Sequence, residues 1–253
     1  MGKKITLFLC LILLFLTGCT KEDIINNKKN GAVDTGLVAQ YQDGSYTSTS
    51  RAYDSYGYGQ TLILEVHSGI ITKVRFYEQN RTGTLKNDTA NTWLSKSDTP
   101  TLAELYSTLV TKLIRAQSAD IDTVSGATKT SQAFKDLATS AISNAQSGST
   151  AVSKVDLDDT YTATSSAPSE TGSIGTLTVI YDGHTISDVQ YDEVKDGSNK
   201  SNNMVYKQLF TVMTRETLKR QELTPITPDP TFPEEYATYN ALLENINSQR
   251  GAF

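Results

Sequence analysis

The sequence contains only two cysteines and two histidines among its 253 residues. Cys10 and Cys19 both lie within the first twenty positions, so the rest of the chain can form no disulfide and carries no thiol. The same scarcity excludes a metal site built from cysteine and histidine ligands. His67 and His184 fall at predicted strand ends or hairpin turns, where we expect exposed side chains. The net charge of −5 leaves no basic excess, so we expect no nucleic-acid partner.

The start of the chain has the pattern of an export signal. Lys3 and Lys4 precede an apolar stretch at residues 5–16, which is too short to span a bilayer. Residues 16–19 read LTGC and resemble the lipobox of bacterial lipoproteins, in which the cysteine is lipidated and becomes the mature N-terminus. An ordinary cleaved signal with an incidental cysteine is the alternative. We predict a lipoprotein signal peptide at residues 1–18 and a lipid anchor on Cys19.

Two stretches of low apolar content separate the remaining parts of the chain. Residues 19–35 are polar without a sustained apolar period, which predicts a flexible tether. Residues 144–155 are rich in serine, glycine and alanine, which is typical of a linker. We place that linker at residues 148–154.

A pattern occurs twice, once on each side of this linker. DGSYTSTS is followed by a hairpin pattern in the first half, and DDTYTATS is followed by a similar one in the second half. Apolar residues alternate with polar ones in both hairpins, and alternation of this kind predicts half-buried strands. The alternating positions are Leu62, Leu64 and Val66 in the first half, and Leu177, Val179 and Tyr181 in the second.

Helical spacing follows each hairpin. Thr101 and Glu104 have the spacing of a capping box before the first helix. We therefore expect an α+β protein of two tandem domains, residues 36–147 and 155–253, each a twisted antiparallel sheet with helices. The apolar positions of the four predicted helices are Leu102, Leu105, Tyr106, Leu109, Val110 and Leu113; Phe134, Leu137, Ala138, Ala141 and Ile142; Val205, Leu209, Val212 and Met213; and Tyr236, Tyr239, Leu243 and Ile246.

The segment between the two helices of the first half reads DTVSGAT, from Asp122 to Thr128. Its small residues allow the backbone to approach a ligand closely. The first N–H groups of the following helix have no partner within the helix and can bind a phosphate. Thr128 adds a hydroxyl. The alternative is a tight turn in which Asp122, Ser125 or Ser131 only caps the helix. A nucleophile elbow is absent.

This motif, followed by Thr130 and Ser131, resembles the signature of the FMN-binding domain family. That family includes covalently flavinylated subunits of Na⁺-translocating quinone reductases and flavinylated surface lipoproteins of Gram-positive bacteria. The resemblance implies that an FAD-dependent flavin transferase joins the phosphate of FMN to the hydroxyl of Thr128. Asp122, Ser125, Gly126 and Ala127 would complete the motif that the transferase recognises. Residues 57–59, which read GYG, are similar to the opening of the family.

The second half departs from this signature. At the corresponding place it reads ELTPITPDPTFPEE, in which Thr231 is the nearest hydroxyl and the prolines lack backbone N–H groups. We expect this half to fold but to bind no flavin, with a role in spacing or in docking a partner. One covalent FMN per chain is therefore expected.

The resemblance implies a lipid-anchored electron carrier on the extracytoplasmic face of a Gram-positive cell membrane, rather than an enzyme with its own substrate. A membrane NADH dehydrogenase or quinol would supply the electrons, and an extracellular acceptor or surface reductase would take them. A non-redox solute-binding or adhesion lipoprotein and a flavin-dependent reductase of a specific substrate are the alternatives. The residues that could contact the flavin, each with a role in the core or at a solvated strand end as the alternative, are Tyr58, Tyr77, Glu78, Asn80, Trp93 and Leu94.

Overall fold

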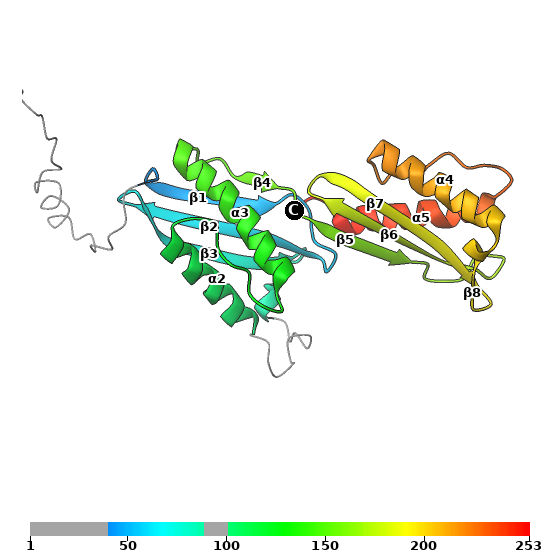
Figure 1. Ribbon diagram of the computed structural model, residues 1–253, viewed down its shortest axis with the longest axis horizontal. Coiled ribbons are helices and arrows are strands. Elements are labelled where there is room, and N and C mark those ends of the chain that lie inside the picture. Colours follow the sequence, from blue (N-terminus) through cyan, green and yellow to red (C-terminus); the bar gives the residue numbers. More distant parts are fainter. Residues whose placement is uncertain (1–39, 89–100) are drawn as a thin grey trace, which may run out of the picture. The chain divides into compact units, whose positions relative to one another are not determined.

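The computed structural model describes residues 40–88 and 101–253 (Figure 1). The predicted signal peptide, Cys19, the tether, Trp93 and Leu94 lie outside the described residues. No helix in the described ranges is long and apolar enough to cross a membrane.

The first sheet forms where the alternating pattern predicts it. The strands β1 (Gly44–Ser50), β2 (Tyr58–His67) and β3 (Ile70–Asn80) pair antiparallel. Leu62 and Leu64 are fully buried, because every second side chain of a strand points to the same face. His67 at the end of β2 and His184 in the second hairpin are exposed, as expected.

The first sheet is mixed rather than purely antiparallel, which corrects the predicted sheet type. The strand β4 (Ser153–Val155) pairs parallel with β1, and the order is β3-β2-β1-β4. The segment that was expected to be a linker therefore ends in a strand. Local composition at residues 148–154 favours a loop, but pairing with β1 recruits its last residues into the sheet.

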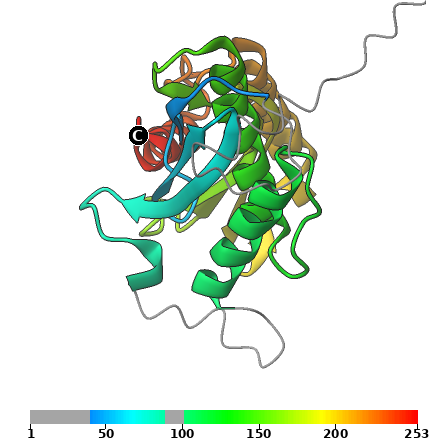
Figure 2. The ribbon, with the colours of Figure 1, turned by 90° about the vertical axis from the view of Figure 1, so that its left-hand side faces the viewer.

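Two helices cover one face of this sheet (Figures 1 and 2). Helix α2 (Leu102–Ala116) packs on β3, and α3 (Thr128–Ser147) packs on β1 and β2. The predicted capping box is present: the Thr101 hydroxyl accepts from the Glu104 N–H, and the Glu104 carboxylate accepts from the Thr101 N–H. The helices and the sheet share one apolar core, which carries most of the stability of such a fold.

The second half repeats this order. The strands β5 (Asp159–Thr164), β6 (Ile174–Asp182), β7 (Thr185–Lys195) and β8 (Ser198–Asn199) form an antiparallel sheet in sequence order. Helices α4 (Met204–Arg220) and α5 (Pro233–Arg250) follow, and this half has its own apolar core. Short 3-10 helices, η1 (Lys86–Asp88) and η3 (Lys200–Asn202), follow β3 and β8.

The two halves share individual contacts as well as element order. Gln117 and Gln221, the C-terminal caps of α2 and α4, both adopt left-handed backbone angles, with φ of 51° and 58°. The side-chain amide of Gln117 bonds both the N–H (2.7 Å) and the C=O (2.9 Å) of Ile71. Gln221 makes the same two bonds to Ile186, at 2.7 and 2.9 Å. Both glutamines thus fix the end of a helix to the hairpin of their own sheet.

One part of the predicted helix pattern is wrong. Val205 and Val212 of α4 are 54% and 56% exposed, although their spacing predicted a buried face. The buried stripe runs through Leu209, Phe210 and Met213.

The described chain from residue 40 onward forms one compact unit, so the division into two tandem domains stays a prediction.

Candidate functional site

The motif predicted from the sequence forms the loop before α3, and Thr128 is the first residue of that helix. Thr128, Asp122 and Ser125 are exposed. Gly126 has a φ of 77°, a left-handed conformation that costs other residues free energy. The loop therefore presents the hydroxyl of Thr128 at the surface, where an enzyme can reach it.

No side chain in the described part of the chain caps the start of α3. The N-cap residue is Ala127, which makes no side-chain cap hydrogen bond, and the first turn contains no acidic residue. The alternative in which Asp122, Ser125 or Ser131 caps the helix is therefore wrong. The first N–H groups of the helix are left for a ligand, and together with the helix dipole they favour an anion such as a phosphate.

Ser131 has a different task from the predicted cap. Its side chain is fully buried, and its Oγ accepts a hydrogen bond of 3.0 Å from the N–H of Val124. On the other side of the loop, Lys112 Nζ donates to the carbonyl of Asp122 at 3.0 Å. Both contacts hold the loop by its backbone and leave its side chains exposed. Thr130 follows in the first turn of α3 and borders the pocket described next.

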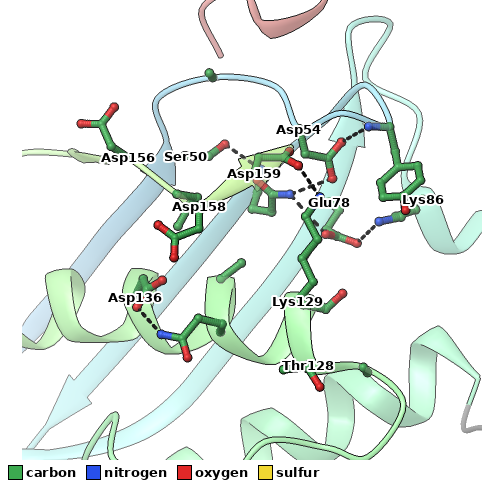
Figure 3. Close-up of a pocket in the computed structure, with 18 of the residues that line it drawn as sticks. Ser50, Asp54, Glu78, Lys86, Thr128, Lys129, Asp136, Asp156, Asp158 and Asp159 are labelled. Atoms are coloured by element: carbon green, nitrogen blue, oxygen red, sulfur yellow. Dashed lines mark hydrogen bonds and ion pairs between the residues drawn. The ribbon is translucent and has the colours of Figure 1, made fainter. Parts of the chain in front are cut away.

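A pocket of about 380 Å³ opens beside this helix end (Figure 3). Residues 126–130 of the motif region form one border of the pocket. Its volume lies within the range of small-molecule sites, about 300–1,000 Å³. Tyr56, 70% exposed, also borders it, and the Lys129 ammonium lies 5.1 Å from the centre of this ring. Tyr56 could not be predicted from the sequence, because an exposed tyrosine in a turn has no periodic pattern.

Glu78 lies at the centre of a buried polar cluster beside this pocket. Its side chain is 2% exposed and pairs with Lys86 Nζ at 2.8 Å. The Tyr106 hydroxyl donates to it at 2.6 Å, and Gln60 Nε2 at 3.3 Å. The interpretation of Glu78 as a solvated strand end is therefore wrong. A buried carboxylate requires such partners, because leaving it unpaired costs several kcal/mol.

Asp54 joins this cluster from the turn before β2. Its Oδ1 accepts from the N–H groups of Tyr56 (2.9 Å) and Tyr58 (2.8 Å), and its Oδ2 accepts from Gln60 Nε2 (3.1 Å). Burial raises the pKa of Asp54, while the hydrogen bond from the Tyr58 N–H and the charge of Lys86 oppose the rise. Asp136 of α3 also borders the pocket, and burial raises its pKa as well.

Among the described residues, the other predicted contact residues, Tyr58, Tyr77 and Asn80, do not border the pocket. Tyr58 and Tyr77 are half-buried, and the Tyr58 ring lies 5.0 Å from Lys86 Nζ. The Asn80 side chain instead closes the turn after β3, since its Oδ1 accepts from the N–H groups of Thr82 and Thr84. Neither tyrosine is among the residues that border the pocket.

One polar atom beside the pocket has no partner. Gln60 borders the pocket, and its Nε2 donates to two carboxylates, which fixes the orientation of the amide. Its Oε1 is buried and has no hydrogen-bond partner among the described residues. Buried polar atoms in native proteins nearly always have a partner, so this atom is consistent with a ligand or ordered water in the pocket. Because Oε1 is an acceptor, its partner would have to be a hydrogen-bond donor.

Residues of the second half also border the pocket, which sequence analysis did not predict. They are Asp156, Leu157, Asp158, Asp159, Tyr161 and Arg250. Figure 3 shows Lys129 extending from the start of α3 toward Asp159. Asp158 and Asp136 lie beside each other in the same view. These residues lie far along the chain from the motif, and no spacing rule connects them to it.

The start of α5 in the second half corresponds to the start of α3, but its residues are less suited to hold a phosphate. The N-cap residues Ala127 and Phe232 have similar backbone angles, with φ of −134° and −131°. Pro233 is the first residue of α5, where Thr128 is the first residue of α3. Pro233 supplies neither a hydroxyl nor an N–H. Glu235 in the same turn pairs with Lys200 at 2.6 Å, and acidic residues there disfavour a phosphate.

An uncapped helix N-terminus beside a pocket is a favourable place for a ligand that carries a phosphate. Residues 57–143, which span β2 to most of α3, match the model of the FMN-binding domain. This segment therefore belongs to the FMN-binding domain family. The match supports FMN as the cofactor and a flavoprotein as the class of the protein.

One solved structure is also similar to the chain. The CPE2226 protein from Clostridium perfringens is 35% identical, over 46% of this chain and 98% of that one, with a TM-score of 0.44. No curated protein matches the chain.

Proposed function

We propose that this protein is a lipid-anchored, extracytoplasmic electron carrier with one FMN covalently attached to Thr128. The observation that carries the proposal is the position of Thr128. Its exposed hydroxyl stands at the uncapped start of α3, on the border of a pocket, within the segment that matches the FMN-binding domain. The single attachment follows from the second half, where Pro233 occupies the equivalent helix position.

The residues of the chain would have four roles in attaching and surrounding the cofactor. The hydroxyl of Thr128 would form the ester with the phosphate, and the first N–H groups of α3 would bind the phosphate oxygens. Asp122, Ser125, Gly126 and Ala127 would present the threonine to an FAD-dependent flavin transferase. The pocket walls, including Tyr56 and Gln60, would limit the access of water. FMN itself would supply the redox chemistry.

A covalent ester suits a protein that works outside the cell, because a dissociated cofactor would be lost by dilution. A membrane NADH dehydrogenase or quinol would reduce the protein, and an extracellular acceptor or surface reductase would oxidise it. The lipid on Cys19 would keep the protein at the extracytoplasmic face of the membrane, close to its electron donor. The resemblance of the LTGC sequence at residues 16–19 to a lipobox supports this location.

A second candidate function has one structural observation in its favour. Asp54 and Asp136 border the pocket, and burial raises the pKa of both carboxyl groups. A carboxyl group with a raised pKa can donate a proton to a substrate near the flavin. This arrangement would suit a flavin-dependent reductase of a specific small molecule. Turnover with a defined acceptor would favour the reductase if Asp136→Asn lowered kcat without changing the flavin content.

The attachment is tested by co-expressing the full chain with a flavin transferase and measuring its intact mass. We expect one FMN adduct on the wild type, none on Thr128→Ala, and one on the matched control Thr130→Ala. The visible spectrum should show flavin absorbance in the same samples. An adduct that persists in Thr128→Ala would contradict the proposed attachment, and a colourless wild type would favour a binding protein without redox chemistry.

A further inference from the structure

Asp159, the first residue of β5, connects three elements at the pocket. Its side chain is only 5% exposed, and its two oxygens accept hydrogen bonds from four donors. Ser55 donates from its N–H (2.8 Å) and its hydroxyl (3.0 Å), and the Thr160 N–H donates at 2.6 Å. The fourth donor is the ammonium of Lys129, which also lies 3.2 Å from the Ser55 hydroxyl.

Lys129 directly follows the attachment threonine in the first turn of α3. Its side chain extends toward Asp159, away from the end of the helix where Thr128 lies (Figure 3). A lysine beside an attached phosphate would otherwise pair with that phosphate. The contact with Asp159 thus holds the positive charge of Lys129 at the border of the pocket.

The loop at residues 51–57 forms another wall of the pocket through residues 52, 54 and 56. Residues of the second half hold this loop at several points. The Tyr161 hydroxyl donates to the Tyr53 carbonyl at 2.6 Å, and the Tyr53 N–H donates to the Arg250 carbonyl at 3.0 Å. Arg51 Nε lies 3.0 Å from Asp156. The shape of this wall therefore depends on residues that follow β4 in the sequence.

We propose that Asp159 is a positioning residue for the flavin site, through which the second half becomes part of that site. By binding Ser55 and Lys129 together, it fixes the loop at residues 51–57 and sets the charge that faces the pocket. This inference rests on the proposed attachment of FMN to Thr128. It gives the second half a role in the redox site, in place of the spacing or docking expected from the sequence.

The charges of the pair predict shifts of opposite sign in the reduction potential. A negative charge near the flavin disfavours the addition of electrons, and a positive charge favours it. Asp159→Asn keeps the shape and one acceptor but removes a negative charge, so the potential should become more positive. Lys129→Met removes the positive charge, so the potential should become more negative. A purely structural role would not produce shifts of opposite sign.

The experiment uses the full chain in two states. In the chain without flavin, hydrogen exchange is measured for the peptide that contains residues 51–57. Asp159→Ala should accelerate exchange there, because the Ser55 N–H loses its acceptor. In the flavinylated chain, the potentials of Asp159→Asn and Lys129→Met are compared with the wild type. Asp182→Asn, an exposed carboxylate at the end of β6, is the matched control and should change neither quantity.

The outcomes separate this inference from the proposed function. A missing FMN adduct on the wild type would contradict the attachment, and the exchange measurement would still decide whether Asp159 positions the loop. A normal adduct with unchanged potentials in both variants, or with shifts in the same direction, would overturn the role of Asp159 at the flavin. Unchanged exchange in Asp159→Ala would overturn its positioning of the loop.

Discussion

The hydroxyl of Tyr106 on α2 donates a hydrogen bond of 2.6 Å to Glu78 on β3. The ring of Tyr106 packs edge-to-face against the ring of Phe76. In the second half, the hydroxyl of Tyr191 on β7 donates the equivalent hydrogen bond to Glu193. The ring of Tyr191 packs edge-to-face against Phe210 of α4. The hydroxyl group is therefore on the helix residue of the ring pair in the first half and on the strand residue in the second half. Glu193 also pairs with Lys200 at 2.8 Å, as Glu78 does with Lys86.

This exchange predicts a compensating pair of substitutions. Tyr106→Phe should lower the free energy of unfolding by about 1–3 kcal/mol, because the buried Glu78 loses a donor. Adding Phe76→Tyr recreates the arrangement of the second half and should recover most of that loss. Urea unfolding of Tyr106→Phe, Phe76→Tyr and the double variant measures the effect. An additive loss in the double variant would show that the two ring positions are not interchangeable.

The pH dependence of stability provides a test of the Asp136 environment. Burial raises the pKa of Asp136 above its ordinary value of 3.8, so the folded state binds this proton more tightly than the unfolded state. The ionised carboxyl therefore destabilises the fold above its folded-state pKa, and this effect disappears as the pH falls below 3.8. Asp136→Asn should be more stable than the wild type at pH 7 and equally stable at low pH.

Chemical or thermal unfolding across the acid range measures this difference. Asp182→Asn, with its exposed carboxyl, serves as the reference and should show no comparable gain. A constant difference between Asp136→Asn and the wild type at every pH would mean that something other than ionisation separates them.

The membrane anchor is predicted from the sequence alone and needs its own experiment. Native protein should partition with membranes and carry lipid on Cys19, because the LTGC sequence has the form of a lipobox. Cys19→Ala should leave the chain unprocessed or released into the medium. Metabolic labelling with a fatty acid, followed by fractionation, measures both properties. Undiminished labelling of Cys19→Ala would place the lipid elsewhere.

Sequence patterns anticipated the parts of the fold that depend on neighbouring residues. The capping box of Thr101 and Glu104 and the alternation in β2 are local, so each was predicted from a few positions. The contact between Ser55 and Asp159 joins residues more than a hundred positions apart, and no period or spacing encodes it. One overlooked signal was present: Glu78 and Glu193 are each followed, eight or seven residues later, by a lysine.

Helical spacing predicted which segments of the second half form helices but was wrong about one face of α4. Val205 and Val212 have a spacing compatible with burial, yet both are exposed. A periodic pattern indicates that one face is apolar without showing how wide the covered stripe is. Which residues of α4 the sheet covers is decided by tertiary packing, which the pattern of one helix does not contain.

The strand β4 changes how the connection between the halves would respond to a protease. A serine-rich segment between two folded parts is normally the first place that is cut, because an extended chain fits a protease cleft. Here α3 continues to Ser147 and β4 begins at Ser153, so only residues 148–152 lie outside regular structure. Cleavage at β4 would require its pairing with β1 to open first. A protease would therefore have only these five residues to bind unless β4 separates from β1, and so short a segment favours keeping both halves, and with them the complete pocket, on one chain.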